Sequence, residues 1–104
     1  MLIVLTTCPD RSEAEALARK LVSERLAACV QILPPITSVY YWEGDIQEEL
    51  EHLLLIKTLP DKWEEVKNYI DKEHSYAVPE VVAIEPFGVS SPYAKWLSSY
   101  LGGE

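Results

Sequence analysis

Few side chains in this chain are able to bind a soft or borderline metal ion. Copper(I) prefers thiolate or thioether ligands, whereas copper(II) accepts imidazole and carboxylate. None of the spacings typical of a closed metal site, such as CxxC, HxxxH or HExxH, occurs in the sequence. The sequence therefore predicts that any copper binding is weak and that no metal is required for folding. The candidate ligands are Cys8, Cys29, His52, His74, Met1 and scattered carboxylates.

Each of these candidates also has a simpler interpretation. Free cysteines are among the most often buried residues, so Cys8 and Cys29 are predicted to be small core residues. His52 lies among charged residues on a predicted strand and is expected to be exposed. His74 follows a predicted helix, where the helix dipole favours a cation, so a capping role is the alternative to a ligand role.

The overall charge excludes several classes of partner. Seventeen acidic and nine basic residues give a net charge of -8, which disfavours nucleic acids and anionic membranes. The run MLIVL is too short for a signal-peptide core, and no apolar segment approaches about 20 residues. With 48% hydrophobic residues, the sequence predicts a cytoplasmic protein with a single domain over residues 1–104.

The order of predicted elements is β-α-β-β-α-β followed by a short helix. This order predicts an α+β, ferredoxin-like fold, with an antiparallel sheet and two helices on one face. The second and fourth strands, which carry the prolines, belong at the sheet edges. The predicted ranges are a strand at 1–8, a helix from Asp10 to about Arg25, strand segments at 26–33 and 36–42 around Pro34-Pro35, a loop at Gly44-Asp45, a strand at 46–58, a helix after Pro60, a strand between Pro79 and Pro86, and a helix from Ser91 closed by Gly102-Gly103.

The predicted hairpin is longer than the helices that would cover it. Its arms extend roughly 25 to 40 Å, against about 24 Å for the first helix. Near the tip, Tyr41 should face one way while Tyr40 and Trp42 face the other. Because the strands are apolar on both faces, another copy of the same chain is the expected cover.

Several segments resemble the CutA family of divalent-cation tolerance proteins. The resemblance implies a non-catalytic homotrimer with a fold similar to PII-type signalling proteins, and a role in tolerance of copper and other divalent metals. The segments are TTCPD at 6–10, ERLAACV at 24–30, SVYYWEG at 38–44, LLLIKT at 53–58, HSYAVPEVVA at 74–83 and YAKWL at 93–97.

The resemblance also suggests ligands. Copper ligands proposed in parts of the family include a cysteine in the first strand and a histidine pair, which match Thr6 and Glu73-His74 here. Only His74 carries over, so copper(II) is expected at His74 with Glu73. For copper(I), Cys29 is the better family match and Cys8 the alternative.

Further family motif residues indicate a pocket between subunits. They are Trp42, Glu43, Lys57, Tyr76 and Glu80, together with Cys29 and His74. Two interpretations remain open for this group, because the pocket can hold a ligand or Lys57 can form an interfacial ion pair with the acids.

Enzyme classes of similar element order fit poorly. An acylphosphatase needs a phosphate-binding loop with a glycine, which TTCPDRSE lacks, and an RNA-recognition domain needs basic residues around its aromatics. The prediction is therefore a CutA-type, non-catalytic protein of metal-ion tolerance. The alternative is a PII-like small-molecule sensor or trimeric scaffold.

Overall fold

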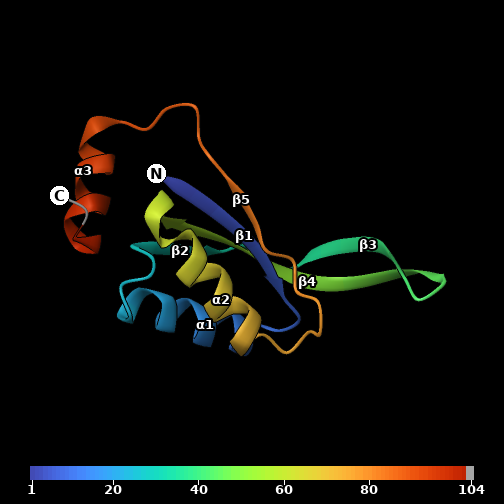
Figure 1. Cartoon of the computed structure of the whole chain (residues 1–104). Coiled ribbons are helices and arrows are strands. Elements are labelled where there is room, and N and C mark those ends of the chain that lie inside the picture. Colours follow the sequence, from blue (N-terminus) through green and yellow to red (C-terminus); the bar gives the residue numbers. More distant parts are fainter. Residues whose placement is uncertain (103–104) are drawn as a thin grey trace.

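The computed structural model describes residues 1–102 and consists of one twisted sheet with helices on one face and at one end (Figure 1). A short 3-10 turn, Pro60–Lys62, precedes the second helix. The elements are β1 (Leu2–Cys8), α1 (Arg11–Ser23), β2 (Cys29–Ile32), β3 (Ile36–Trp42), β4 (Asp45–Thr58), α2 (Trp63–Glu73), β5 (Val82–Ile84) and α3 (Ser91–Leu101).

The sheet has the strand order β2-β4-β1-β5, and all pairings are antiparallel. The predicted second strand is divided into β2 and β3, both of which pair with β4. The predicted edge positions are confirmed, since β2 and β5 end the strand order. The α+β ferredoxin-like prediction is therefore confirmed.

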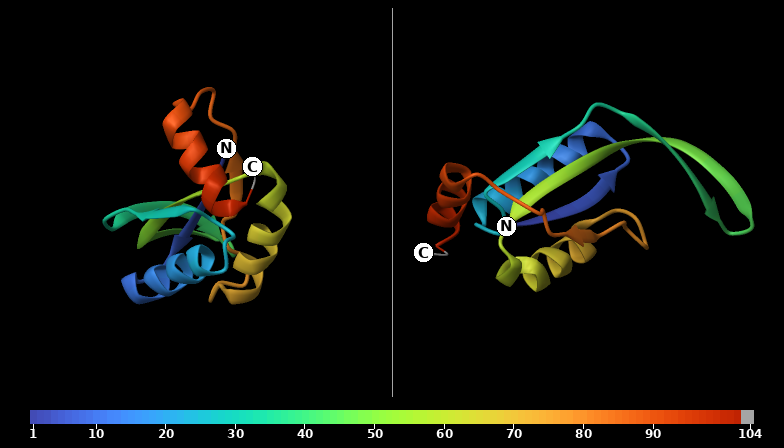
Figure 2. Two further views of the ribbon diagram at one scale, coloured as in Figure 1. Left: turned by 90° about the vertical axis from the view of Figure 1, so that its left-hand side faces the viewer. Right: turned by 90° about the horizontal axis from the view of Figure 1, so that it is seen from above.

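Strand alternation separates the sheet into a helix-covered face and an open face. Even-numbered residues of β1 and of the part of β4 that pairs with it, 52–58, point toward α1 and α2. Among them Val4 and Ile56 are fully buried, as are Leu21 and Ile70 of the helices. Both helices lie on this side of the sheet (Figure 2). The open face is also largely apolar, and we define it by Ile3, Leu5, Leu53, Leu55, Val82 and Ile84, with Cys29, Gln31 and Lys57 toward the β2 edge.

The helix ends follow local chemistry. The Asp10 carboxylate accepts a hydrogen bond from the Glu13 backbone N–H at 2.8 Å, as the capping pattern predicted. α1 stops at Ser23 rather than near Arg25, because Arg25 has a left-handed φ of 58° that a helix cannot include. α3 ends at Gly102 in the left-handed region, and Gly103 lies outside the described residues.

Pro34 and Pro35 interrupt the edge strand with a shift of register. Ile32 pairs with Leu54, whereas Ile36 pairs with Glu51, so the proline segment contains one residue more than β4 does opposite it. This is a bulge, which accommodates residues without an N–H donor at a sheet edge.

The tip of the hairpin differs by one residue from the predicted Gly44-Asp45 loop. Trp42 pairs with Asp45, so the two turn residues are Glu43 and Gly44, with φ values of 49° and 90°. Two positive φ values are typical of a type I′ turn, whose twist matches that of the flanking strands. The prediction was wrong because it took glycine for the first turn residue.

The hairpin extends beyond the helices, which gives the described chain a longest dimension of 47 Å against 26 and 23 Å (Figure 2). As predicted, Tyr41 faces away from Tyr40 and Trp42, and it is 71% exposed. The other exposed apolar residues of Tyr41's face are Val39, Ile46 and Leu50.

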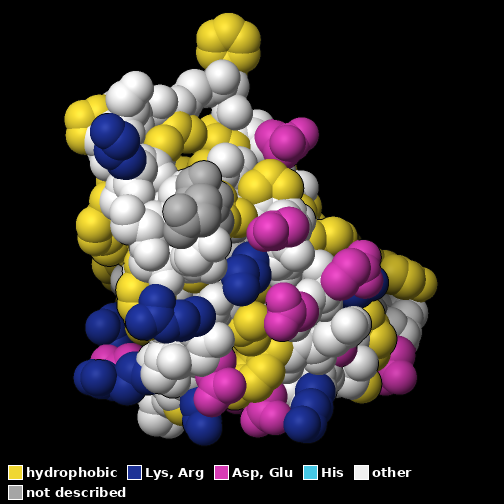
Figure 3. Space-filling model, turned by 60° about the vertical axis from the view of Figure 1, so that its left-hand side comes forward, with side chains coloured by type: hydrophobic (Ala, Val, Ile, Leu, Met, Phe, Trp, Pro, Cys, Tyr) yellow, Lys and Arg dark blue, Asp and Glu magenta, His cyan; other side chains and the backbone are white. Residues whose placement is uncertain are grey.

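The opposite end of the molecule is formed by α3, which packs on Ala28 through Leu97 and Leu101. Figure 3 shows apolar side chains gathered in the upper part of this end and charges of both signs mixed below. Phe87 and Trp96 are among the exposed apolar residues of the chain. No helix within residues 1–102 combines the length and apolar character that a membrane crossing requires.

Candidate functional site

A pocket of about 670 Å³ lies where the base of the hairpin meets the segment that follows α2. β3 and β4 contribute one wall, and residues 76–80 contribute the other. Its principal polar and aromatic lining residues are Thr7, Tyr40, Trp42, Gln47, Glu49, Glu51, Tyr76 and Glu80.

The pocket is acidic, and two tyrosines organise its carboxylates. The Tyr76 hydroxyl donates to Glu51 Oε2 and the Tyr40 hydroxyl to Glu49 Oε1, each at 2.8 Å. Burial raises the pKa of Tyr76, and the bond to Glu51 raises it further; the bond to Glu49 is the main cause of the raised pKa of Tyr40. Both tyrosines therefore remain neutral donors at physiological pH. No Lys, Arg or His within the described range lines the pocket.

His74 holds one wall of the pocket in place. Its ring is buried, and Nε2 donates to the Thr7 carbonyl at 2.6 Å while the Tyr76 backbone N–H donates to Nδ1 at 3.0 Å. Because a carbonyl only accepts, the ring carries its proton on Nε2 and is neutral in this arrangement. We call these two bonds the His74 latch. It joins the end of β1 to the backbone of the residue whose hydroxyl binds Glu51.

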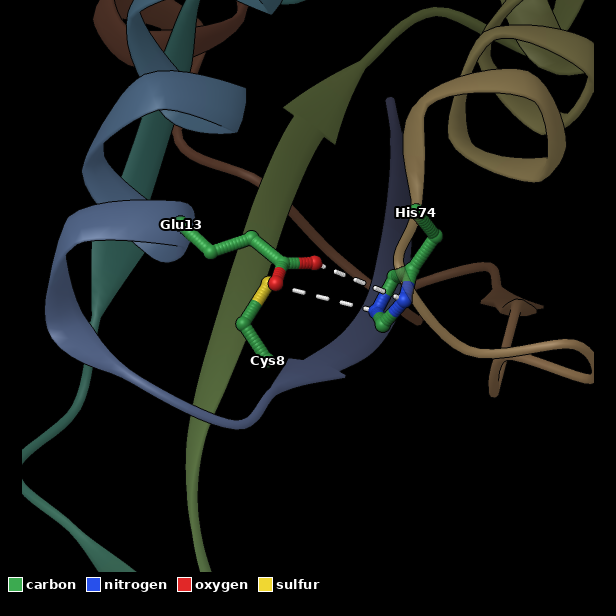
Figure 4. Close-up of side chains that lie close together, drawn as sticks. All are labelled: Cys8, Glu13 and His74. Carbon is green, nitrogen blue, oxygen red and sulfur yellow. Dashed lines mark hydrogen bonds and ion pairs between the residues drawn. The ribbon is translucent and has the colours of Figure 1, made fainter.

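Glu13 and Cys8 surround the latch (Figure 4). Glu13 reaches from α1 and accepts hydrogen bonds from the backbone N–H and the hydroxyl of Ser75. Its Oε2 lies 3.6 Å from His74 Nδ1, and Cys8 Sγ lies 4.0 Å from Nε2. Burial is the main cause that raises the pKa of the Cys8 thiol from 9.0 to about 12, with the neighbouring carboxylates adding to it.

Cys8, Glu13 and His74 place one potential ligand atom each within 4.8 Å of one another. Their donor chemistry does not fit a resident metal ion in this arrangement. Both ring nitrogens of His74 are hydrogen-bonded, Cys8 is a protonated thiol where a metal needs thiolate, and Glu13 already binds Ser75. The cluster is a hydrogen-bonded junction of β1, α1 and the segment after α2.

The predicted pocket residues separate into two groups. Trp42, Tyr76 and Glu80 line the pocket, whereas Glu43 is an exposed turn residue at the hairpin tip. Lys57 lies toward the other end of β4, with its ammonium 5.6 Å from the Tyr93 ring centroid. Within one chain, therefore, the five predicted residues do not form one pocket.

The predicted metal ligands are also separated. Cys29 of β2 pairs with Lys57 of β4, and Cys8 of β1 pairs with His52 of β4. The two cysteines are therefore separated by about 17 Å in the direction of β4. It is Cys8, fully buried as predicted, that approaches His74. Glu73 is exposed at the end of α2.

The prediction of an exposed His52 was wrong. His52 is 8% exposed, and its Nδ1 donates to the Leu33 carbonyl at 3.1 Å. Its even position on β4 places it on the helix-covered face.

The sequence analysis missed several residues of the site, and strand alternation could have found those on the hairpin. Glu49 and Glu51 lie on the same side of β4, opposite even-numbered residues of β3 such as Tyr40. A long-range contact placed Glu13 beside Ser75, 62 positions away, and no local pattern reveals it.

The geometry can be compared with known proteins. A family description, the CutA1 divalent ion tolerance protein, matches residues 2–100. The chain belongs to the CutA1 family. The solved structure of CutA1 from Pyrococcus horikoshii superposes with a TM-score of 0.92 at 39% identity, covering 96% of this chain and 97% of that one. A periplasmic divalent cation tolerance protein CutA from Archaeoglobus fulgidus gives 0.93 at 33% identity, covering 97% and 99%.

Curated CutA1 relatives are similarly close in sequence. The divalent-cation tolerance protein CutA of Thermus thermophilus is 41% identical over 100 residues, which cover 96% of this chain and 97% of the relative. The chloroplastic protein CutA of Arabidopsis thaliana is 43% identical over 98 residues. That match covers 94% of this chain but 54% of the plant protein, so the chain spans about half the length of this relative.

Proposed function

We propose that this CutA1 chain acts in divalent-cation tolerance as a non-catalytic homotrimer, folded as a single domain over residues 1–104. The observation that carries the assembly is the apolar surface left uncovered by the chain's own helices. Val82 and Ile84 on the open face are 46% and 47% exposed, and Ile46 and Leu50 on the hairpin are 77% and 66% exposed. The two pairs lie on opposite faces of the sheet, so apolar side chains are exposed on both faces, and exposed apolar surface of this extent is typical of interfaces.

The absence of catalytic chemistry in the proposal rests on the protonation states of the site. The Cys8 thiol has a pKa of about 12 and is buried, so it is no nucleophile at neutral pH. His74 uses both ring nitrogens to hold backbone groups, which leaves neither free for proton transfer.

Copper binding, in this proposal, is weak and centred on His74. A metal at the ring must displace either the Thr7 carbonyl or the Tyr76 N–H, and each displacement leaves a backbone group unpaired at a cost of about 1–3 kcal/mol. Glu13 supplies a closer carboxylate than the exposed Glu73. Cys8 replaces Cys29 as the thiol for copper(I), because it lies beside the ring.

Three measurements test the proposal. Light scattering of the metal-free protein at micromolar concentration should give three times the chain mass, and a monomer would refute the assembly. Copper(II) titration of His74→Ala should show lost affinity, with His52→Ala as the matched buried-histidine control. Copper(I) affinity should fall in Cys8→Ser but not in Cys29→Ser. Unchanged affinity in His74→Ala and Cys8→Ser would remove this site.

The alternative function is a PII-like small-molecule sensor or scaffold, and the pocket of about 670 Å³ favours it. That volume falls within the range typical of ligand sites. Thermal-shift measurements with small anions, nucleotides and amines separate the two functions, since a sensor should be stabilised by one of them without metal. A cytoplasmic location stays a prediction, because relatives described as chloroplastic and periplasmic belong to the same family.

A further inference from the structure

Glu51 is a buried carboxylate without a cationic partner. It is 7% exposed and accepts one hydrogen bond, from the neutral Tyr76 hydroxyl. No Lys, Arg or His in residues 1–102 lies within 4.0 Å of its oxygens. Buried charges in proteins are normally paired, because transfer of an isolated carboxylate from water is costly. A positive charge in the pocket would therefore supply the partner that Glu51 lacks.

Lys57 presents the complementary situation. It is the one lysine or arginine in the five strands, it is half-buried, and its ammonium approaches the Tyr93 ring rather than any carboxylate. Lys57 and Glu51 are both odd-numbered residues of β4, which places them on the same face of the sheet. Six positions separate them, a distance of about 20 Å along the strand. The two charges cannot meet within one chain.

We propose that the Lys57 ammonium of a second copy enters the pocket and pairs with Glu51. This inference rests on the assembly proposed above and states what each copy contributes to the site of its neighbour. In a closed ring, each subunit donates one Lys57 and receives another, so every buried carboxylate acquires a partner. Assembly then completes the pocket, because Lys57 of one copy lies beside Trp42, Tyr76 and Glu80 of another.

The lining of the pocket fits an alkylammonium group better than a bare metal ion. Tyr40, Trp42 and Tyr76 offer aromatic rings, which attract cations, beside the carboxylates of Glu49 and Glu51. A hard divalent ion needs about six oxygen ligands at 2.0 to 2.6 Å. Here, Glu51 Oε2 and Glu49 Oε1 are each bound to a tyrosine hydroxyl, and the volume far exceeds that of an ion.

A double-mutant cycle on the full chain tests the pairing. Dissociation of the assembly is measured by sedimentation over a series of protomer concentrations for Lys57→Met, Glu51→Gln and the double variant. Glu51→Gln retains an acceptor for Tyr76. We expect each single substitution to raise the dissociation constant of the assembly about tenfold or more. In the double variant, the increase should be smaller than the product of the two single increases by at least about tenfold.

Matched controls come from exposed residues of α2, away from the hairpin and the open face. Asp71→Asn removes an exposed negative charge and Lys72→Met removes an exposed positive charge. Both should leave assembly within about twofold of the parent. Multiplicative effects of Lys57→Met and Glu51→Gln would overturn the pairing, even if the parent is a trimer. A monomeric parent would instead refute the assembly itself.

Chemical rescue gives an independent readout. Lys57→Ala removes the equivalent of propylammonium, so added propylammonium should restore assembly of Lys57→Ala, while propanol should not. The double variant Lys57→Ala/Glu51→Gln should show no rescue. If the assembled parent protein itself bound free propylammonium in a Glu51-dependent way, the pocket would be vacant in the assembly and the proposal would be wrong.

Discussion

Replacing His74 by phenylalanine should destabilise the protein strongly in the absence of any metal. The substitution retains a planar ring but removes both bonds of the His74 latch, which leaves the Thr7 carbonyl and the Tyr76 N–H without their partner. Each unpaired buried backbone group costs about 1–3 kcal/mol, so the free energy of unfolding should fall by about 2–6 kcal/mol.

His52 supplies the matched control for this substitution. It is similarly buried but makes one such bond, to the Leu33 carbonyl, so His52→Phe should cost about half as much. A third variant, His74→Asn, places an amide oxygen near the position of Nδ1, where it can accept from the Tyr76 N–H. It should recover part of the loss.

Urea unfolding at one fixed protomer concentration, with EDTA present, measures all three variants against the parent. The fixed concentration matters because dissociation contributes to the apparent stability of an oligomer. Equal destabilisation by His74→Phe and His52→Phe would refute the argument that His74 holds two elements together. Loss of less than about 1 kcal/mol in His74→Phe would do the same.

Three further predictions concern Cys8, the hairpin turn and the aromatic residues. Burial raises the Cys8 pKa from 9.0 to about 12, so the thiol ionises first in the unfolded chain, and the free energy of unfolding should fall as pH rises from 9 toward 12. Over this pH range the urea midpoint of Cys8→Ala should decline less steeply than that of the parent. Parallel curves for the two proteins would contradict this prediction. Gly44→Ala should lower the free energy of unfolding by about 1 kcal/mol, as measured by thermal unfolding. The cause is the φ of 90° at this position alone, since nothing lies within 4 Å of an added Cβ. An unchanged Tm would count against the turn assignment. Trp42→Ala should promote dissociation more than Trp63→Ala, because Trp42 is exposed on the hairpin while Trp63 packs on the core; equal dissociation by light scattering would reverse that assignment.

Local chemistry was sufficient to predict most elements of the fold. The capping residue Asp10, the prolines at the sheet edges and the apolar runs of β1 and β4 each specify a local conformation, and together they are compatible with one topology. The errors are confined to element ends. The turn at Glu43 and Gly44 was shifted by one residue because either register of a short loop satisfies the same local pattern.

The site was less predictable, because its contacts join residues that are distant in the chain. Tyr76 and Glu80 were predicted from family motifs, but Glu51 lies 25 positions from its partner Tyr76, and Glu13 lies 62 positions from Ser75. His74 was predicted to lie at a helix end, where the structure places it, yet the buried ring and its proton position depend on the Thr7 carbonyl of another strand.

The sequence by itself determined which residues form strands and helices and which faces of them are apolar, since spacing and capping act over a few positions. The register between β1 and β4 then decided that Cys8, and not Cys29, lies beside His74. It also decided that Lys57 and Glu51 share a face about 20 Å apart. Such distances depend on how whole strands align, which is a property of the tertiary structure, because the alignment is set by the combined burial of the core.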